Sequence, residues 1–236
     1  MPLGDLGSGA EGSTVLRDLL RTTRPKNYGP SVLMTILGAW AGGGRSLAAL
    51  ASPQVWVVAG CSAGVALASC ALNDYFDMRN DAINAPDKPL VRGTVQKDHV
   101  VLLCLGLYSA VLAGACMLDS WVVRGIVAAS CVATLLYTPL FKRIAFLKNA
   151  VVAGTIAASI AAGAAAAGQA LAHPVVIGPA AFVFFSMMAR EVLMDVADVD
   201  GDAVAGVKTV PVLLGRRAGV TLAMAMAVAA GVVAGR

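Results

Sequence analysis

Charged and aromatic side chains are scarce in this sequence. Of its 236 residues, 14% are charged and 6% are aromatic, whereas 58% are hydrophobic. A soluble domain carries about 25% charged residues, so this composition excludes an ordinary water-soluble protein. We therefore expect a lipid bilayer, and no nucleic acid, among its partners.

Cysteine and histidine patterns typical of metal or redox sites are also missing. The five cysteines contain no CxxC pair, and all of them lie inside apolar segments. His99 follows Asp98 and His173 precedes Pro174, so neither histidine has a partner that indicates a catalytic base. We interpret the cysteines as small hydrophobic residues and the histidines as loop or capping residues.

Alanine, glycine and valine dominate the apolar segments. Small residues let membrane helices approach closely, and Gly154, Gly163 and Gly168 are candidates for such contacts. A simple alanine-rich bias explains this stretch equally well, so both interpretations stay open.

Hydrophobic runs bounded by charge or proline predict membrane helices, since each crossing needs about 20 residues. The seven predicted ranges are 28–48, 54–75, 98–118, 121–140, 148–171, 174–196 and 210–234. The fold class is thus all-α, a multi-span transmembrane helical bundle. We expect residues 1–20 to form a flexible N-terminal segment and residues 21–236 to form the transmembrane domain.

Aspartates recur with one spacing at the ends of the second and sixth predicted helices. The first cluster is Asp74, Asp77 and Asp81, and the second cluster is Asp195, Asp198 and Asp202. Positions i, i+3 and i+7 share one face of a helix, where carboxylates repel each other and need a cation. Mg²⁺ suits such a site, because it binds oxygen ligands and completes its shell with water and a phosphate-bearing substrate. All six aspartates are therefore predicted metal ligands.

Basic residues mark one side of the membrane. They precede the first helix and fill the loops that follow the second, fourth and sixth helices, whereas the opposite loops carry only Arg45 and Arg124. The positive-inside rule makes the basic side cytosolic, or its matrix or stromal equivalent, and both clusters open on it. Membrane topology alone explains why most of these basic residues lie on one side.

Some basic residues flank the acidic clusters and are predicted to bind a diphosphate. They are Arg79, Lys88, Arg92, Lys142, Lys148, Arg190 and Lys208. Glu191, beside Arg190, is better explained as a local ion-pair partner than as a metal ligand.

Two acidic clusters four helices apart suggest two related halves around a central cavity. Such a cavity has carboxylates at its mouth and apolar walls below, which suits a prenyl diphosphate with its polyanionic head and long apolar tail. Bound Mg²⁺ would neutralise the leaving group, and departure of pyrophosphate would leave an allylic cation in a dry pocket.

Two stretches resemble the signatures of the UbiA superfamily of intramembrane prenyltransferases: Asn73-Asp74-x-x-Asp77-x-x-x-Asp81 and Asp195-x-x-Asp198-x-x-x-Asp202. Arg24-Pro25 and the stretches 83–93 and 208–215 agree with it. The resemblance implies a transferase with Mg²⁺ as cofactor. It would move a prenyl group from its diphosphate to a small aromatic, chlorin or glycerolipid acceptor. The resemblance also adds Asn73 to the first metal and diphosphate site.

Family members use a tyrosine and a lysine after the fourth helix, near the allylic carbon and the diphosphate. Tyr137 and Lys142 match them, although four residues separate the pair where the family has three, and Thr138-Pro139 absorbs the difference. With Asp77, these two are the predicted catalytic residues. An interfacial aromatic anchor remains the alternative for Tyr137.

The resemblance departs from the family in length. The family typically has nine helices, so we expect a C-terminally incomplete domain. A catalytically inactive truncated paralogue with a binding or regulatory role is the alternative. A cation transporter is disfavoured, because the carboxylates lie at one membrane face and leave the midplane uncharged. The stretch 73–93 favours geranylgeranyl or phytyl donors.

Overall fold

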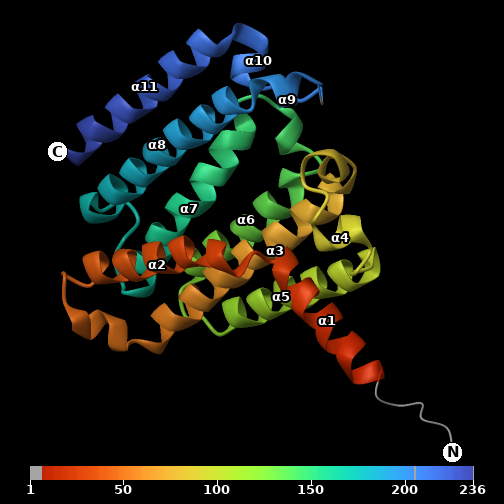
Figure 1. The fold of residues 1–236 in the computed structure, drawn as a ribbon. Helices are drawn as coiled ribbons and strands as arrows, with labels where there is room; N and C mark the ends of the chain where they lie inside the picture. The colour runs from red at the N-terminus through yellow and green to blue at the C-terminus, as the bar shows by residue number, and fades with distance from the viewer. Residues whose placement is uncertain (1–6, 205, 236) are drawn as a thin grey trace, which may run out of the picture.

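The structure is a computed structural model that describes residues 7–204 and 206–235, and all of its elements are helical (Figure 1). The α-helices are α1 Gly7–Thr22, α2 Tyr28–Gly42, α3 Pro53–Asn84, α4 Pro89–Arg92, α5 Lys97–Cys116, α6 Trp121–Tyr137, α7 Leu147–Ala166, α8 Pro174–Ala197, α9 Val199–Val204, α10 Val210–Leu214 and α11 Arg216–Ala234. Three short 3-10 helices join them: η1 Pro25–Asn27, η2 Leu47–Ala51 and η3 Phe141–Arg143. The all-α prediction is confirmed.

Long helices occupy all seven ranges predicted from hydropathy. Within the part of the chain that the structure describes, five of them are long and apolar enough to cross a membrane: α3, α5, α7, α8 and α11. The other two are shorter, with 15 residues in α2 and 17 in α6. A full crossing needs about 20 residues, so these two helices are shorter than predicted.

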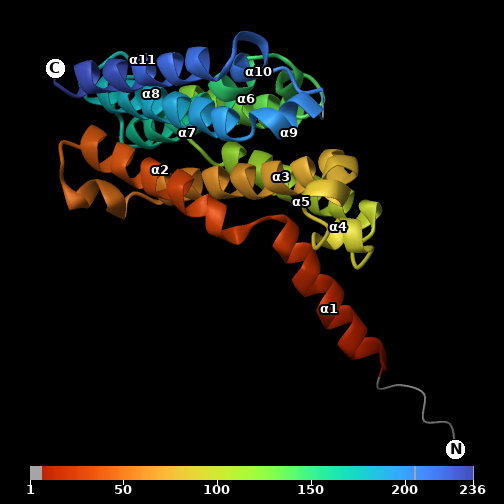
Figure 2. The same ribbon diagram turned by 45° about the horizontal axis from the view of Figure 1, so that its top comes forward.

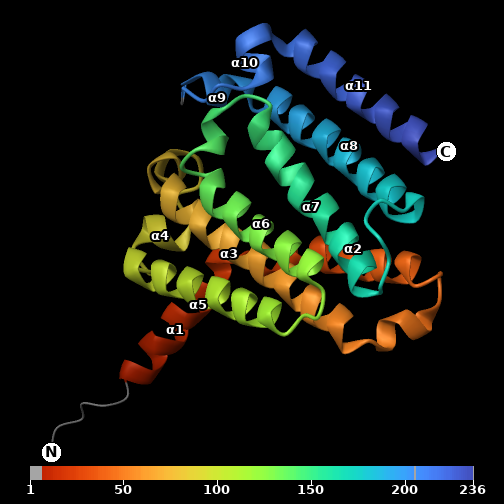
Figure 3. The same cartoon turned by 180° about the vertical axis from the view of Figure 1, so that it is seen from behind.

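The long helices pack in two groups. In one group α8 lies between α7 and α11, and in the other α3 lies between α2 and α5 (Figure 2). The packing of α2 against α7 joins the groups, and α6 lies beside both α7 and α3 (Figure 3). The five helices α2, α3, α6, α7 and α8 therefore surround the middle of the molecule.

The contact between α2 and α7 depends on glycine. A Cβ atom on Gly163 would lie 2.0 Å from the backbone oxygen of Thr35, and one on Gly38 would also strike the facing backbone. Close packing through small residues is thus confirmed at Gly163. It is wrong at Gly154 and Gly168, where a Cβ atom would meet nothing within 4 Å.

The other polar and sulfur side chains behave largely as predicted. Cys61, Cys104 and Cys131 are buried free thiols inside the bundle. His173 caps α8, because its Nδ1 atom accepts a hydrogen bond from the backbone of Val175 at 3.2 Å.

The N-terminal segment contains a helix where flexibility was expected. Residues 7–22 form α1, which projects away from the bundle (Figure 2), and residues 1–6 lie outside the described part. Its last turns carry an ion pair between Arg21 and Asp18 at 3.0 Å. The C-terminal ends of α3 and α8, the turn η3 and the short helices α4 and α9 gather at one end of the bundle (Figure 1).

Candidate active site

The first cluster lies on α3, close to the C-terminal end of that helix. Asp74 is buried, and one of its oxygens contacts Arg24 at 2.5 Å and Lys88 at 2.9 Å. Lys88 also contacts Asp81 at 2.6 Å. One lysine therefore bridges the first and last carboxylates of the cluster, which reduces their mutual repulsion.

The middle carboxylate, Asp77, is held from a distant part of the chain. Lys142, in η3, forms an ion pair with Asp77. The Thr138 hydroxyl, just after α6, donates a hydrogen bond to the side-chain oxygen of Asn73 at 2.8 Å. Two contacts thus fasten the segment after α6 to the face of α3 that carries the cluster.

The second cluster is anchored by the start of α7. Asp195 is buried near the end of α8, and Lys148 contacts one of its oxygens at 2.8 Å. The Asn149 amide donates a hydrogen bond to the other oxygen at 3.0 Å. Both oxygens of this carboxylate are therefore paired, as a buried charge requires.

This cluster does not follow one continuous helix, so the prediction that its carboxylates share a helix face is wrong. The helix α8 ends at Ala197, Asp198 is its C-cap residue, and Asp202 lies in α9. In consequence Asp195 is buried, Asp198 is exposed and Asp202 is half-buried.

The two clusters lie close together in space. Burial raises the pKa of Asp202 and the neighbouring aspartates raise it further, whereas Lys148 and Lys142 act in the opposite direction. Lys142 forms an ion pair with Asp77 and also lowers the pKa of Asp202, so it lies near both clusters.

The predicted diphosphate-binding cations fall into three groups. Lys88, Lys142 and Lys148 contact cluster carboxylates directly. Arg190 forms the local pair with Glu191 that the sequence favours, and it lines the central cavity. Three others are exposed and form no ion pair with either cluster within residues 7–204 and 206–235: Arg79, Arg92 and Lys208.

The oxygen atoms at this end of the bundle fit Mg²⁺ by their chemistry. Carboxylate and amide oxygens are the ligands that hard divalent cations take. Asn149 is 2% exposed, and its Oδ1 atom has no hydrogen-bond partner among the described residues. Such a buried acceptor costs about 1–3 kcal/mol, so a ligand there would be stabilised. No three acidic, histidine or cysteine side chains in the described chain converge on one point, and lysines and Arg24 lie against the carboxylates.

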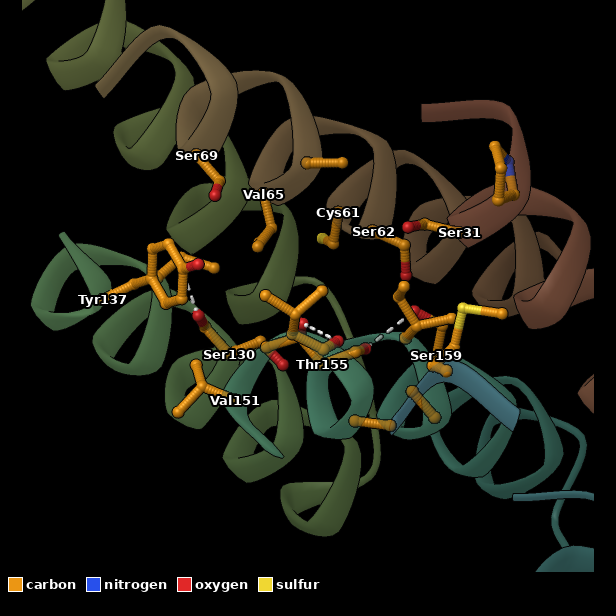
Figure 4. A pocket seen from close by; sticks show the side chains of 18 of the residues that line it. Ser31, Cys61, Ser62, Val65, Ser69, Ser130, Tyr137, Val151, Thr155 and Ser159 are labelled. Carbon is orange, nitrogen blue, oxygen red and sulfur yellow. Dashed lines mark hydrogen bonds between the residues drawn. The ribbon is translucent and has the colours of Figure 1, made fainter. Parts of the chain in front are cut away.

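A cavity of about 480 Å³ lies between α2, α3, α6, α7 and α8 (Figure 4). Its walls combine apolar side chains such as Val65 and Val151 with serine and threonine hydroxyls. Tyr137, the last residue of α6, lines the cavity and lies within electrostatic range of Asp77 and Asp195. Tyr137 therefore lies at the junction of the cavity and the two clusters.

Sequence reasoning missed three polar residues that hold the clusters. Arg24 was seen only as part of a family resemblance, and its contact with Asp74 joins positions 50 residues apart. Asn149 is a polar residue at the start of an apolar run, which is a weak signal for a buried role. Thr138 was named only for the spacing between Tyr137 and Lys142, because its contact with Asn73 exists only in the folded chain.

Comparison with known proteins identifies relatives over most of this chain. The model of the UbiA prenyltransferase family matches residues 31–235. A digeranylgeranylglyceryl phosphate synthase from Natronomonas pharaonis is 36% identical over 91% of this chain and 75% of its own length. The enzyme of the same name from Thermococcus gammatolerans is 31% identical over 86% of this chain and 71% of its own length.

Solved structures share the fold. A structure of digeranylgeranylglyceryl phosphate synthase has a TM-score of 0.77 at 22% identity, covering 93% of this chain and 76% of that one. A UbiA homolog from Archaeoglobus fulgidus, bound to GPP and Mg²⁺, has a TM-score of 0.73 at 19% identity. That match covers 92% of this chain and 76% of the homolog.

Proposed function

This chain belongs to the UbiA prenyltransferase family and is a multi-pass membrane prenyltransferase, and we propose that its acceptor is a glyceryl phosphate lipid. The relatives at 36% and 31% identity are synthases of digeranylgeranylglyceryl phosphate, a name that describes two geranylgeranyl groups on glyceryl phosphate. We accordingly propose geranylgeranyl diphosphate as the donor, which agrees with the donor class favoured by the stretch 73–93.

One structural observation carries the donor part of this proposal. A single short segment between α6 and α7 supplies Lys142 to the first cluster and Lys148 to the second, beside a cavity that Tyr137 lines. Cations and carboxylates together suit a diphosphate with its metal, and the cavity suits the prenyl tail. Its volume of about 480 Å³ falls in the range of about 300–1,000 Å³ that small-molecule sites occupy.

The aspartates divide into two roles in this proposal. Asp77, Asp81 and Asn73 would hold one Mg²⁺, and the second cluster would hold another. Asp74 is the most buried and already shares Arg24 and Lys88, so its role is to position those two cations. Bound Mg²⁺ would supply charge neutralisation at the departing diphosphate.

The chain's own residues bind and orient the reactants. Lys142 and Lys148 reach the diphosphate oxygens, and the ring of Tyr137 borders the allylic carbon, where its negative face favours developing positive charge. The allylic C–O bond breaks, and its electron pair leaves with the diphosphate. The acceptor oxygen forms an ether bond to that carbon, and its hydroxyl proton leaves with the diphosphate product.

The mouth of this site is proposed to face the cytosol or its equivalent. The basic loops after α3, α6 and α8 lie at the end of the bundle that carries both clusters, and the positive-inside rule supports that side.

An acceptor panel tests the proposal. Membranes containing this chain receive labelled geranylgeranyl diphosphate and Mg²⁺, together with geranylgeranylglyceryl phosphate, an aromatic acid or a chlorin. The expected result is a labelled ether lipid from the first acceptor alone, lost on addition of EDTA. Transfer only to an aromatic acid or a chlorin would overturn the acceptor assignment.

A further inference from the structure

The side of the cavity formed by α6 and α7 carries three hydroxyl groups, and each already donates its proton to a backbone oxygen. Ser130 donates to the backbone oxygen of Ile126 at 2.9 Å, and Thr155 donates to that of Val152 at 2.9 Å. Ser159 donates to the backbone oxygen of Thr155 at 3.3 Å. All three hydroxyls line the cavity (Figure 4).

Ser62, on α3, supplies a fourth cavity hydroxyl, and it also donates its proton within the protein. Thr35 donates its one hydroxyl proton to the backbone oxygen of Ser31 at 3.0 Å. Ser62 and Thr35 are 3.0 Å apart, so the proton between their oxygens must come from Ser62. Ser62 also lines the cavity, next to Cys61 on the same turn (Figure 4).

These four residues, Ser62, Ser130, Thr155 and Ser159, are called the acceptor wall below. Each hydroxyl has one proton and two lone pairs, so an oxygen that donates within the protein can still accept a hydrogen bond. An anionic carboxylate against this wall would meet only lone pairs. An uncharged hydroxyl group can donate its one proton to one of these oxygens.

Two cations line the same cavity. Lys26 precedes α2 and forms no ion pair within the described chain, and Arg190 on α8 has more N–H groups than its pairing with Glu191 uses. A ligand that carries both a hydroxyl and an anionic phosphate would match both features of the cavity.

We propose that the acceptor wall binds the hydroxyl of the lipid acceptor, and that Lys26 and Arg190 bind the acceptor's phosphate. This inference rests on the proposed function and deepens it. The acceptor O–H donates to the wall, which directs the oxygen before attack. Arg190 thus serves the acceptor instead of the donor diphosphate expected from the sequence, which agrees with its lack of contact to either cluster.

Thr155 gives a matched pair of variants for the wall. Thr155→Val keeps the shape and removes the oxygen, whereas Thr155→Ser keeps the oxygen. We expect the KM for geranylgeranylglyceryl phosphate to rise about fivefold in Thr155→Val, the loss typical of one hydrogen bond, and to stay near wild type in Thr155→Ser. The KM for the donor stays unchanged in both. A second readout without turnover is the thermal stabilisation that the acceptor alone confers, which shrinks only in Thr155→Val.

The cations are tested with and without the phosphate. Lys26→Ala and Arg190→Ala should raise the KM for geranylgeranylglyceryl phosphate but leave that for geranylgeranylglycerol unchanged. Lys97→Ala serves as the control at an exposed lysine outside the cavity. The contrary result is wild-type transfer to geranylgeranylglyceryl phosphate together with an unaltered KM for that acceptor in Thr155→Val. That result would overturn the proposed role of the acceptor wall. Absence of wild-type transfer to any glyceryl lipid would instead overturn the proposed function.

Discussion

Lys142, in the turn after α6, forms an ion pair with Asp77, which precedes it by 65 residues on α3. Six residues after Lys142, Lys148 contacts Asp195 on α8 at 2.8 Å. One short segment therefore holds a carboxylate from each cluster. Its two lysines are well placed to exchange these carboxylates for diphosphate oxygens when substrate binds.

Lys142, near both clusters, should govern donor binding. In Lys142→Met the charge on Asp77 loses its partner and the diphosphate loses a cation. The expected KM for geranylgeranyl diphosphate rises about tenfold or more, since hydrogen bonds to charged groups contribute about 1.5–3 kcal/mol. Arg143→Gln, at the exposed neighbouring position, is the matched control for loss of one positive charge and should have nearly wild-type kinetics. Equal effects in the two variants would contradict the specific role of Lys142.

Asn149 should set the requirement for Mg²⁺. Asn149→Leu removes both the donor to Asp195 and the buried Oδ1 atom, while its volume stays similar. We expect the Mg²⁺ concentration for half-maximal activity to rise about tenfold, by the same estimate for a hydrogen bond to a charged group. Titration of bound Mg²⁺ by calorimetry checks this without turnover. A variant with wild-type Mg²⁺ affinity would contradict a role for Asn149 beside the metal site.

Two glycines on α7 should respond oppositely to the same substitution. In Gly163→Ala the new Cβ atom would lie 2.0 Å from the Thr35 backbone oxygen, so α2 and α7 must separate. The expected loss is about 1–3 kcal/mol, measured as a lower midpoint of thermal unfolding in detergent. Gly154→Ala adds its Cβ atom in open space and gains about 1 kcal/mol of helix propensity, so its midpoint should hold or rise. A Gly163→Ala protein as stable as wild type would contradict the close packing of α2 against α7.

Asp18 should keep α1 attached over a wide pH range. The Thr94 side chain and then Arg21 lower the pKa of Asp18 below its ordinary value of 3.8, against an opposing effect of burial. A lowered pKa means that the folded protein favours the charged carboxylate. Its stabilisation is therefore complete above pH 3.8 and is lost as the pH falls through the lower folded value.

Hydrogen exchange of residues 14–22 measures this attachment. After correction for intrinsic rates, protection in the wild type should be constant from about pH 5 to 8, where an ordinary carboxyl is ionised. Asp18→Asn should reduce protection across that whole range. Protection that falls between pH 8 and 5 in the wild type would contradict the assigned role of Asp18.

The two ends of the bundle should be accessible from opposite sides of the membrane. Arg79→Cys reports the end that carries the clusters, and Ala170→Cys reports the connection between α7 and α8, each in a background with exposed Cys116 replaced by Ala. A membrane-impermeant maleimide should label Arg79→Cys only in inside-out vesicles and Ala170→Cys only in right-side-out vesicles. The reverse pattern would overturn the proposed cytosolic mouth.

Local sequence patterns predicted the helices well and the contacts between them poorly. Hydropathy located α8 to within one residue of its observed end, and the spacing of the first cluster correctly assumed one helix, α3. The same spacing misled at the second cluster, because α8 stops before Asp198 although the sequence pattern continues. Lys142 with Asp77, and Asn149 with Asp195, join residues that only tertiary packing brings together.

The glycines of α7 also show that contacts between helices were hard to predict from the sequence. Gly163 and Gly154 lie on the same helix and looked equivalent in the sequence, yet only the first faces the α2 backbone. Which face of a uniformly apolar helix meets a neighbour depends on the packing of the whole bundle, so it could not be derived from the run itself.

Asp77 and Asp200 provide the most direct test of the central claim, that catalysis occurs where the two clusters meet above the cavity. Asp200 is a matched control, since it lies outside the spacing of the second cluster and pairs at the exposed surface with Arg216 at 2.7 Å. The measurement is Mg²⁺-dependent transfer of labelled geranylgeranyl groups to geranylgeranylglyceryl phosphate by Asp77→Asn and Asp200→Asn proteins in membranes. The account predicts that Asp77→Asn loses at least about a hundredfold in kcat/KM, the order of loss when one group that stabilises transition-state charge is removed. Asp200→Asn should stay near wild type. Full activity in Asp77→Asn, or equal losses in both variants, would contradict the account.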